Sequence, residues 1–215
     1  MHVEAAILAR TIPARPAGRP RDRRLDAAVL AATRALLVEV GYRDLSIGAI
    51  ARRSGVDRPA IYRRWRTKAE LVHAAIYPAG DLTLRVRDSG DFARDLRRFA
   101  RNAVQLFSRP EVMAAIPGLM IDIRHDPSLR DRLSPRLEAS ARADFALLVE
   151  RAIGRGEAQP HIHPETLFDA LAGTVFLRIV TAGPSALDGL ADELTALLLH
   201  GTRAARRPGA GGGRR

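Results

Sequence analysis

The segment from Ser46 to Trp65 holds the side chains whose types and spacing best suit a chemical task. Arg58, Tyr62, Arg63 and Arg64 lie in one stretch of seven residues, after the pattern of a short helix and a turn. An arginine can donate two hydrogen bonds to guanine O6 and N7, and a helix fits the major groove of B-DNA where those atoms are exposed. The segment therefore predicts a helix that binds duplex DNA.

Five residues of this segment and its entry are typical of a helix-turn-helix. Ser46 precedes an apolar helical turn, as an N-cap does, and Ala51 is small enough for two helices to cross there. Gly55 tolerates the positive φ that the turn needs. Asp57 can cap the second helix, and Pro59 lies in its first turn, where a missing N–H costs nothing.

Burial of the apolar side of the second helix leaves one set of side chains to project from it. We expect this set to be Arg58, Ala60, Tyr62, Arg63 and Arg64. Tyr62, Ser46 and Lys68 suit contacts to phosphates, and Lys68 lies at a helix N-terminus, which favours an anion. The same pattern would also fit a small helical subdomain with exposed arginines.

Helical periodicity continues on both sides of this motif. Apolar residues recur at helical spacing over Leu25–Val40, Gly41 ends that helix, and Thr67-Lys-Ala-Glu70 is a capping box that begins a helix through Ala75. The later predicted helices are Asp91–Phe107, Glu111–Ile123, Pro127–Gly154, Pro164–Ala182 and Ala186–Gly201. The sequence shows no strand pattern. We predict an all-α fold of about nine helices, in which a three-helix helix-turn-helix domain precedes a larger helical domain.

Charge is distributed unevenly along the 215 residues, whose net charge is +11. Residues 1–77 carry 15 Lys/Arg against 7 Asp/Glu, whereas residues 78–200 carry 15 against 17. A basic small domain beside a nearly neutral larger one favours a polyanionic partner for the first. The predicted divisions are a basic arm (1–21), the DNA-binding domain (22–77), the larger helical domain (78–203) and a Gly/Arg tail (204–215).

Several function classes find no support in the composition. No cysteine is present, so disulfides and thiolate metal sites are excluded. No signal peptide or apolar run of membrane-spanning length is visible, and we expect a cytoplasmic protein without a membrane partner. His161 and His163 with Glu165 match no strong zinc motif, and no catalytic constellation appears. We therefore predict no metal, no cofactor and no enzymatic activity.

Residues 24–76 resemble the DNA-binding domain of the TetR family of regulators. The matching features are Val40-Gly41-Tyr42, Leu45-Ser46-Ile47, Ile50-Ala51, Gly55-Val56, Ile61-Tyr62, Trp65 and Thr67-Lys68-Ala69-Glu70-Leu71. Gly18-Arg19-Pro20-Arg21 and Tyr62-Arg63-Arg64-Trp65 resemble an actinobacterial-type subgroup. The resemblance implies an all-α homodimer, usually a repressor that a small molecule releases from a palindromic operator. It also implies base contacts from Arg58, Pro59, Ala60, Tyr62 and Arg64.

Two apolar stripes near the C-terminus suit a four-helix bundle between two copies of the chain. The predicted interface residues are Leu167, Leu171, Val175, Ile179, Leu187, Leu190, Leu194, Leu197 and Leu198. An ordinary core within one chain would produce the same spacing. A two-fold dimer would match its recognition helices to half-sites about 34–36 Å apart, or a multiple of that distance.

An effector cavity is expected among the helices between Asp91 and Arg178. Its candidate walls are Phe99, Phe107, Met113, Ile116, Met120, Phe145, Phe168 and Phe176, with Arg124 or Arg178 as a polar anchor. The alternative is that these residues are plain core. An apolar lining would favour a hydrophobic or amphipathic effector.

Two other functions compete with a ligand-responsive, sequence-specific regulator of this kind. One is a basic protein that binds nucleic acid without sequence preference. The other is a small-molecule-binding enzyme with an incidental helix-turn-helix. A large ratio of specific to non-specific DNA affinity would distinguish the regulator from the non-specific nucleic-acid protein. The enzyme would require a set of catalytic residues.

Overall fold

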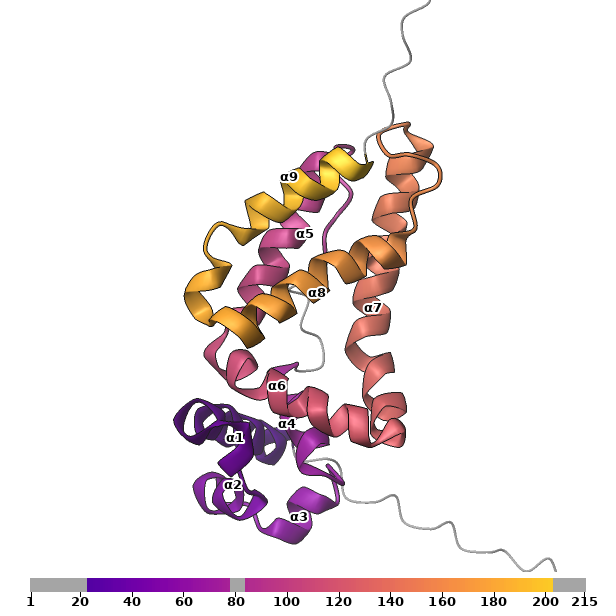
Figure 1. Ribbon diagram of the computed structural model, residues 1–215. Coiled ribbons are helices and arrows are strands. Elements are labelled where there is room, and N and C mark those ends of the chain that lie inside the picture. Colours follow the sequence, from indigo (N-terminus) through magenta and orange to yellow (C-terminus); the bar gives the residue numbers. More distant parts are fainter. Residues whose placement is uncertain (1–22, 78–83, 203–215) are drawn as a thin grey trace, which may run out of the picture.

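The computed structural model describes residues 23–77 and 84–202 of the chain. These residues form nine α-helices and one short 3₁₀ helix, so the predicted all-α fold is confirmed (Figure 1). The predicted basic arm (1–21) and Gly/Arg tail (204–215) lie outside the described residues. In the described part of the chain, no helix is long and apolar enough to cross a membrane.

Four helices form an N-terminal unit at the lower end of the molecule in Figure 1. Their bounds are α1 Arg23–Asp44, α2 Ile47–Ser54, α3 Arg58–Tyr62 and α4 Lys68–Ile76. Gly41 adopts a positive φ of 72° and interrupts α1, as the sequence predicts for a residue that ends a helix. Gly55 has a φ of 69° and turns the chain between α2 and α3.

Side chains cap these helices where the sequence predicts caps. Ser46 Oγ accepts from Ala49 N at 3.2 Å, and Asp57 Oδ1 accepts from Ala60 N at 2.7 Å. Thr67 Oγ1 accepts from the N–H of Glu70 at 3.1 Å. Helices α2, α3 and α4 therefore each begin with a side-chain N-cap hydrogen bond from the predicted residue.

The remaining helices form a C-terminal unit. Their bounds are α5 Phe92–Phe107, α6 Pro110–His125, α7 Pro127–Gly154, α8 Pro164–Ala182, η1 Pro184–Leu187 and α9 Leu190–Thr202. The helix predicted over Ala186–Gly201 begins later, because Asp188 is extended and Gly189 has a φ of 74°. α7 runs along one side of the molecule, and α8 crosses in front of the other helices in Figure 1.

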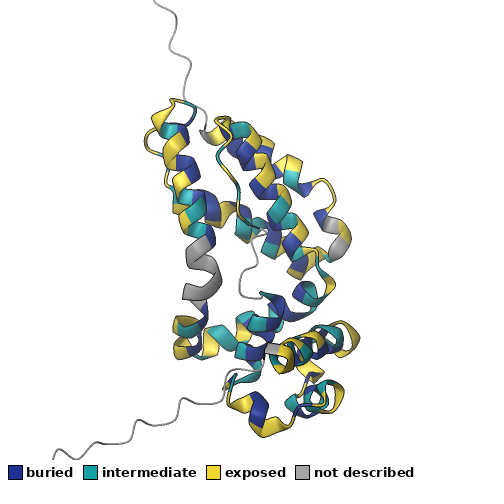
Figure 2. Ribbon diagram, turned by 180° about the vertical axis from the view of Figure 1, so that it is seen from behind, coloured by how far each residue is buried: buried dark blue, intermediate teal, exposed yellow. Residues whose placement is uncertain are grey.

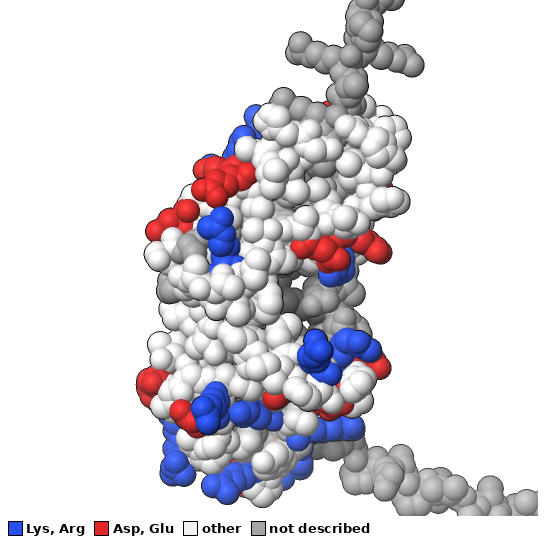
Figure 3. Space-filling model, in the orientation of Figure 1, with Lys and Arg blue, Asp and Glu red and all other residues white. Residues whose placement is uncertain are grey.

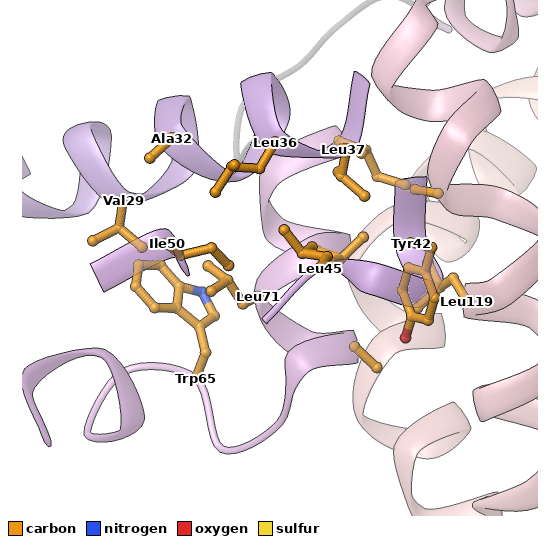
Figure 4. Packing of buried hydrophobic residues seen from close by; sticks show 14 of the residues in the cluster. Val29, Ala32, Leu36, Leu37, Tyr42, Leu45, Ile50, Trp65, Leu71 and Leu119 are labelled. Carbon is orange, nitrogen blue, oxygen red and sulfur yellow. The ribbon is translucent and has the colours of Figure 1, made fainter. Parts of the chain in front are cut away.

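Buried side chains form two cores, and their division differs from the boundary expected at residues 77 and 78. The first core joins α1–α4 to Val112, Ala115, Ile116 and Leu119 of α6 and to the start of α7. Figure 4 shows Tyr42 of α1 beside Leu119 of α6. The second core lies among α5, α7, α8 and α9, and the buried faces of these helices point inward in Figure 2. Thus α6, although it belongs to the C-terminal unit, packs mainly against the helices of the N-terminal unit.

Candidate nucleic-acid interface and internal cavity

Helix α3 and its C-cap residue Arg63 expose four of the eight predicted DNA-contacting side chains. Arg58, Pro59, Tyr62 and Arg63 are exposed, while Ile61 is fully buried against the rest of the N-terminal unit. The guanidinium of Arg58 lies over α2, where a Cβ on Gly48 would come within 3.0 Å of its Cζ. Glycine at position 48 therefore lets the Arg58 side chain lie close to the α2 backbone.

Basic side chains gather over the N-terminal unit at the lower end of Figure 3. The exposed ones in this unit are Arg24, Arg43, Arg52, Arg53, Arg58, Arg63 and Arg66. Arg53 is paired with Glu39 at 2.5 Å. The charge asymmetry of the sequence is thus a surface property of the fold, and an exposed basic helix of this kind suits the phosphates and base edges of DNA.

Two members of the predicted recognition surface face the protein instead. Ala60 is buried, because it packs in the turn that Asp57 caps. Arg64 forms an ion pair with Asp26 of α1, and its Nη1 donates to the carbonyl of Ala60 at 3.0 Å. Arg64 therefore links the end of α3 to α1, and neither Ala60 nor Arg64 belongs to the exposed surface of α3.

Lys68 also has a structural partner that the sequence did not indicate. Its Nζ donates to the carbonyl of Tyr42 at 3.0 Å and lies 4.3 Å from the centre of the Tyr42 ring. It thus bridges α4 to the end of α1, and a phosphate contact from Lys68 would have to be made in addition to these contacts. Ser46 is exposed, and its side chain caps α2.

Tyr42 connects the N-terminal unit to α6. Its hydroxyl donates to Asp122 Oδ2, and its ring packs so closely on Gly118 that a Cβ there would lie 2.7 Å from the ring carbon Cγ. Burial and the neighbouring Asp122 carboxylate raise the pKa of Tyr42, so the phenol stays protonated and able to donate. We call Tyr42, Lys68, Gly118 and Asp122 the Tyr42 junction.

A cavity of about 270 Å³ is bounded by α4, α5, α6, α7 and α8 and by Leu84, which precedes α5. It is lined by His73, Tyr77, Leu84, Phe99, Ala103, Leu106, Phe107, Leu119, Met120, Ile123, Arg130, Leu133, Ala141, Arg142, Phe168, Leu171 and Ala172. Its volume is close to the lower end of the range of about 300–1,000 Å³ that is usual for small-molecule sites. The described walls are mostly apolar, and none of their residues is acidic.

The cavity includes some of the predicted effector-binding residues and omits others. Phe99, Phe107, Met120 and Phe168 line it. Met113, Ile116, Phe145 and Phe176 do not line it. They pack in or against the two cores. The predicted anchors Arg124 and Arg178 are on the surface, and Arg178 lies 3.9 Å from Glu193.

Sequence reasoning missed the polar groups that do line the cavity, chiefly Arg130 and Arg142 of α7 and His73 of α4. The signal that could have found the arginines is the periodic series Leu129, Leu133, Ala141 and Phe145, beside which both lie on the helix.

The predicted interface stripe proves to be mostly core within one protomer. Eight of its nine residues are buried, and Leu171 and Val175 have no exposed surface. Only Leu197 of the predicted set is exposed, at 68%. The large exposed apolar side chains of α8 are instead Leu177 and Val180, which are not among those nine residues. Helical spacing identified the buried face of α8 rather than its outer face.

Both the N-terminal and the C-terminal unit match known protein families. Residues 86–198, over half of the chain, match the family described as "Tetracyclin repressor-like, C-terminal domain". Residues 29–75 match "Bacterial regulatory proteins, tetR family". The chain belongs to the TetR family. The predicted family resemblance is therefore confirmed, and it extends beyond the helix-turn-helix into the C-terminal unit.

Individual members of the TetR family match the chain over most of its length. A DNA-binding transcriptional repressor from Mycobacteroides abscessus is 30% identical over 193 residues, which cover 86% of this chain and 95% of that protein. The HTH-type regulator YdeS of Bacillus subtilis is 27% identical over 187 residues, covering 87% and 94%. The crystal structure of the TetR family regulator SCO0332 superposes with a TM-score of 0.61 at 25% identity, covering 80% and 97%.

As a TetR family member, the chain is a DNA-binding transcription regulator. The family consists of regulators rather than enzymes. Among the described residues, no group of three or more His, Cys, Asp or Glu side chains is placed to hold a metal ion.

Proposed function

We propose that this regulator is a homodimeric repressor whose hold on a palindromic operator is released when a small molecule enters the cavity. The observation that carries the proposal is the position of α6 between the cavity and the Tyr42 junction. On one side of α6, Gly118 and Asp122 contact Tyr42. Leu119, Met120 and Ile123, in the same two turns of α6, line the cavity.

We expect a ligand that moves this part of α6 to move Tyr42 as well, because the ring packs directly against Gly118 and its hydroxyl is bonded to Asp122. Helix α4 supports the same coupling. His73 and Tyr77 line the cavity, while Lys68 at the other end of α4 holds Tyr42. Glu70 of α4 pairs with Arg132 of α7 at 2.7 Å. We infer that effector binding changes the orientation of the N-terminal units, so that the two recognition helices no longer match the half-site spacing.

The dimer that this mechanism needs is assigned to the outer faces of α8 and α9. Leu177 and Val180 are 58% and 49% exposed on α8, beside the exposed small residues Ala170 and Gly173. Leu197 is exposed on α9. Exposed apolar side chains on two neighbouring helices support an interface that forms a four-helix bundle with the same helices of a second copy.

Selection of binding sites from random duplex DNA, followed by titration of the best site at fixed salt, tests this function. We expect a palindromic site that binds at least about 1,000-fold more tightly than a scrambled duplex. A promoter that overlaps the site should be repressed by the protein and restored by a cavity ligand. The absence of an enriched sequence, with equal salt-sensitive binding to all duplexes, would contradict the proposal and favour a protein without sequence preference.

A further inference from the structure

We infer that the effector is a small apolar acid, with one anionic head bound by Arg142 and an apolar body in the cavity. This inference rests on the effector site proposed above and adds the chemical class of its ligand. It is carried by the distribution of charge around the cavity. Its described walls contain Arg130 and Arg142 but no acidic residue. An apolar body with a single negative charge complements such a lining, because a buried charge needs an opposite partner.

The two arginines lie at opposite ends of the cavity. Both belong to α7, where they are twelve positions apart, a separation of about 18 Å along the helix. The side chain of Arg130 is 65% exposed and lies 3.7 Å from Asp131. A solvated, exposed arginine contributes little to ion pairing, since water screens it and its side chain loses freedom on binding. Arg142 is therefore the better anion partner.

Neighbouring groups hold the Arg142 guanidinium in a fixed orientation. It lies 4.5 Å from the centre of the Phe168 ring, and Phe168 is itself a wall of the cavity. Its Nη2 is 2.6 Å from Asp169 Oδ1, and its side chain is only 35% exposed. A guanidinium that is stacked on an aromatic ring and half-buried binds a carboxylate with less loss of side-chain freedom than a free one.

Asp169 competes with the ligand for the same guanidinium. Its side chain is 62% exposed, and it does not line the cavity. An acid that enters the cavity would share Arg142 with Asp169 or replace it. The structure therefore makes an unusual prediction, that removal of the Asp169 carboxylate strengthens the binding of an acid.

Calorimetric titration of the full-length protein with matched probes tests this inference. The probes are hexanoate, octanoate and decanoate, each compared with the alcohol and the amine of the same chain length below its micelle concentration. We expect at least one acid to bind about tenfold more tightly than its alcohol and amine. Asp169→Asn should tighten the binding of the acid and leave the alcohol unchanged, and Arg142→Gln should abolish the preference for the acid. Arg98→Gln, which removes an exposed arginine of α5 that does not line the cavity, is the control.

The results of this titration test the acid class of the effector independently of the proposed function. If the alcohol or amine binds as tightly as the acid, if the preference survives in Arg142→Gln, or if no probe binds, the acid class is wrong. Operator binding is measured on the same preparations. A protein that binds its operator but prefers no acid overturns this inference alone, whereas loss of sequence-specific DNA binding overturns the proposed function.

Discussion

At the scale of single residues, the structure separates arginines that can approach DNA from arginines that hold the fold. Arg58 at the start of α3 and Arg63 directly after it are exposed, and neither has an ion pair among the described residues. Arg64, two positions after Tyr62, forms an ion pair with Asp26. Sequence spacing cannot make this distinction, because it depends on where α1 lies relative to α3.

Replacing Arg58 or Arg63 by alanine should weaken operator binding by about 1–3 kcal/mol, since each substitution removes a donor to base edges or phosphates. Loss of a base contact reduces specific binding more than non-specific binding. The measurement is titration of operator and scrambled duplexes by fluorescence anisotropy. Arg98→Ala removes the same charge from α5 and should leave both affinities unchanged. Equal losses in all three variants would contradict a role for α3.

Lys68→Ala should destabilise the fold by about 0.5–2 kcal/mol, because the Nζ contacts to the Tyr42 carbonyl and ring are lost. Urea unfolding gives the free energy of unfolding for the variant and the wild type. Arg66→Ala, a nearby exposed residue at the start of α4, is the control. An unchanged urea midpoint for Lys68→Ala would contradict this structural role of the lysine.

At the scale of the helices, the decisive contact is that of α1 with α6. Gly118→Ala adds a methyl group against the Tyr42 ring, which should cost about 1–3 kcal/mol of overpacking against a gain of about 1 kcal/mol in helix propensity. We expect the variant to bind operator differently from the wild type even without ligand. Gly154→Ala, on α7 with open space around it, should change neither stability nor operator affinity appreciably. If Gly118→Ala and Gly154→Ala bind operator with the same affinity, the Tyr42 ring does not transmit movement of α6.

The carboxylate of Glu157 links the start of α5 to the segment after α7, and its contribution to the stability of the fold depends on pH. Hydrogen bonds from Arg155 lower the pKa of Glu157, and so does the backbone N–H of Phe92, which Glu157 Oε2 accepts at 2.7 Å. Because the folded-state pKa lies below the unfolded value, this stability is present above the ordinary glutamate pKa and is lost as the pH falls through the folded pKa. The wild type should therefore lose stability below about pH 4 more steeply than Glu157→Gln, as followed by thermal unfolding. Glu150→Gln, on the exposed side of α7, should follow the wild type.

At the scale of the whole molecule, local signals and tertiary packing contributed differently to what could be predicted. Ser46, Gly55 and Asp57 act through neighbouring residues, so their roles were predictable from sequence. The dimer stripe and the cavity anchors were not, since periodicity shows that a helix has an apolar face but not which neighbour covers it. Leu171 and Leu177 are six positions, about 1.7 turns, apart on α8, yet one lies in the core and the other in solvent.

Leu177→Glu and Leu197→Glu should each raise the dissociation constant of the dimer by at least about tenfold, because they place a charge in an apolar interface. Sedimentation velocity over a concentration series measures this constant. Leu147→Glu, which alters a comparably exposed leucine of α7, should not change it. A dimer that is unaffected by the first two substitutions would place the interface elsewhere.

The central claim is that occupancy of the cavity and binding of the operator are coupled through α6. The most direct test is the affinity of one cavity ligand for the free protein and for the operator-bound protein. Coupling is reciprocal, so the ligand should bind the operator complex at least about fivefold more weakly, and it should weaken operator binding by the same factor. Equal ligand affinities in the two states would contradict the account.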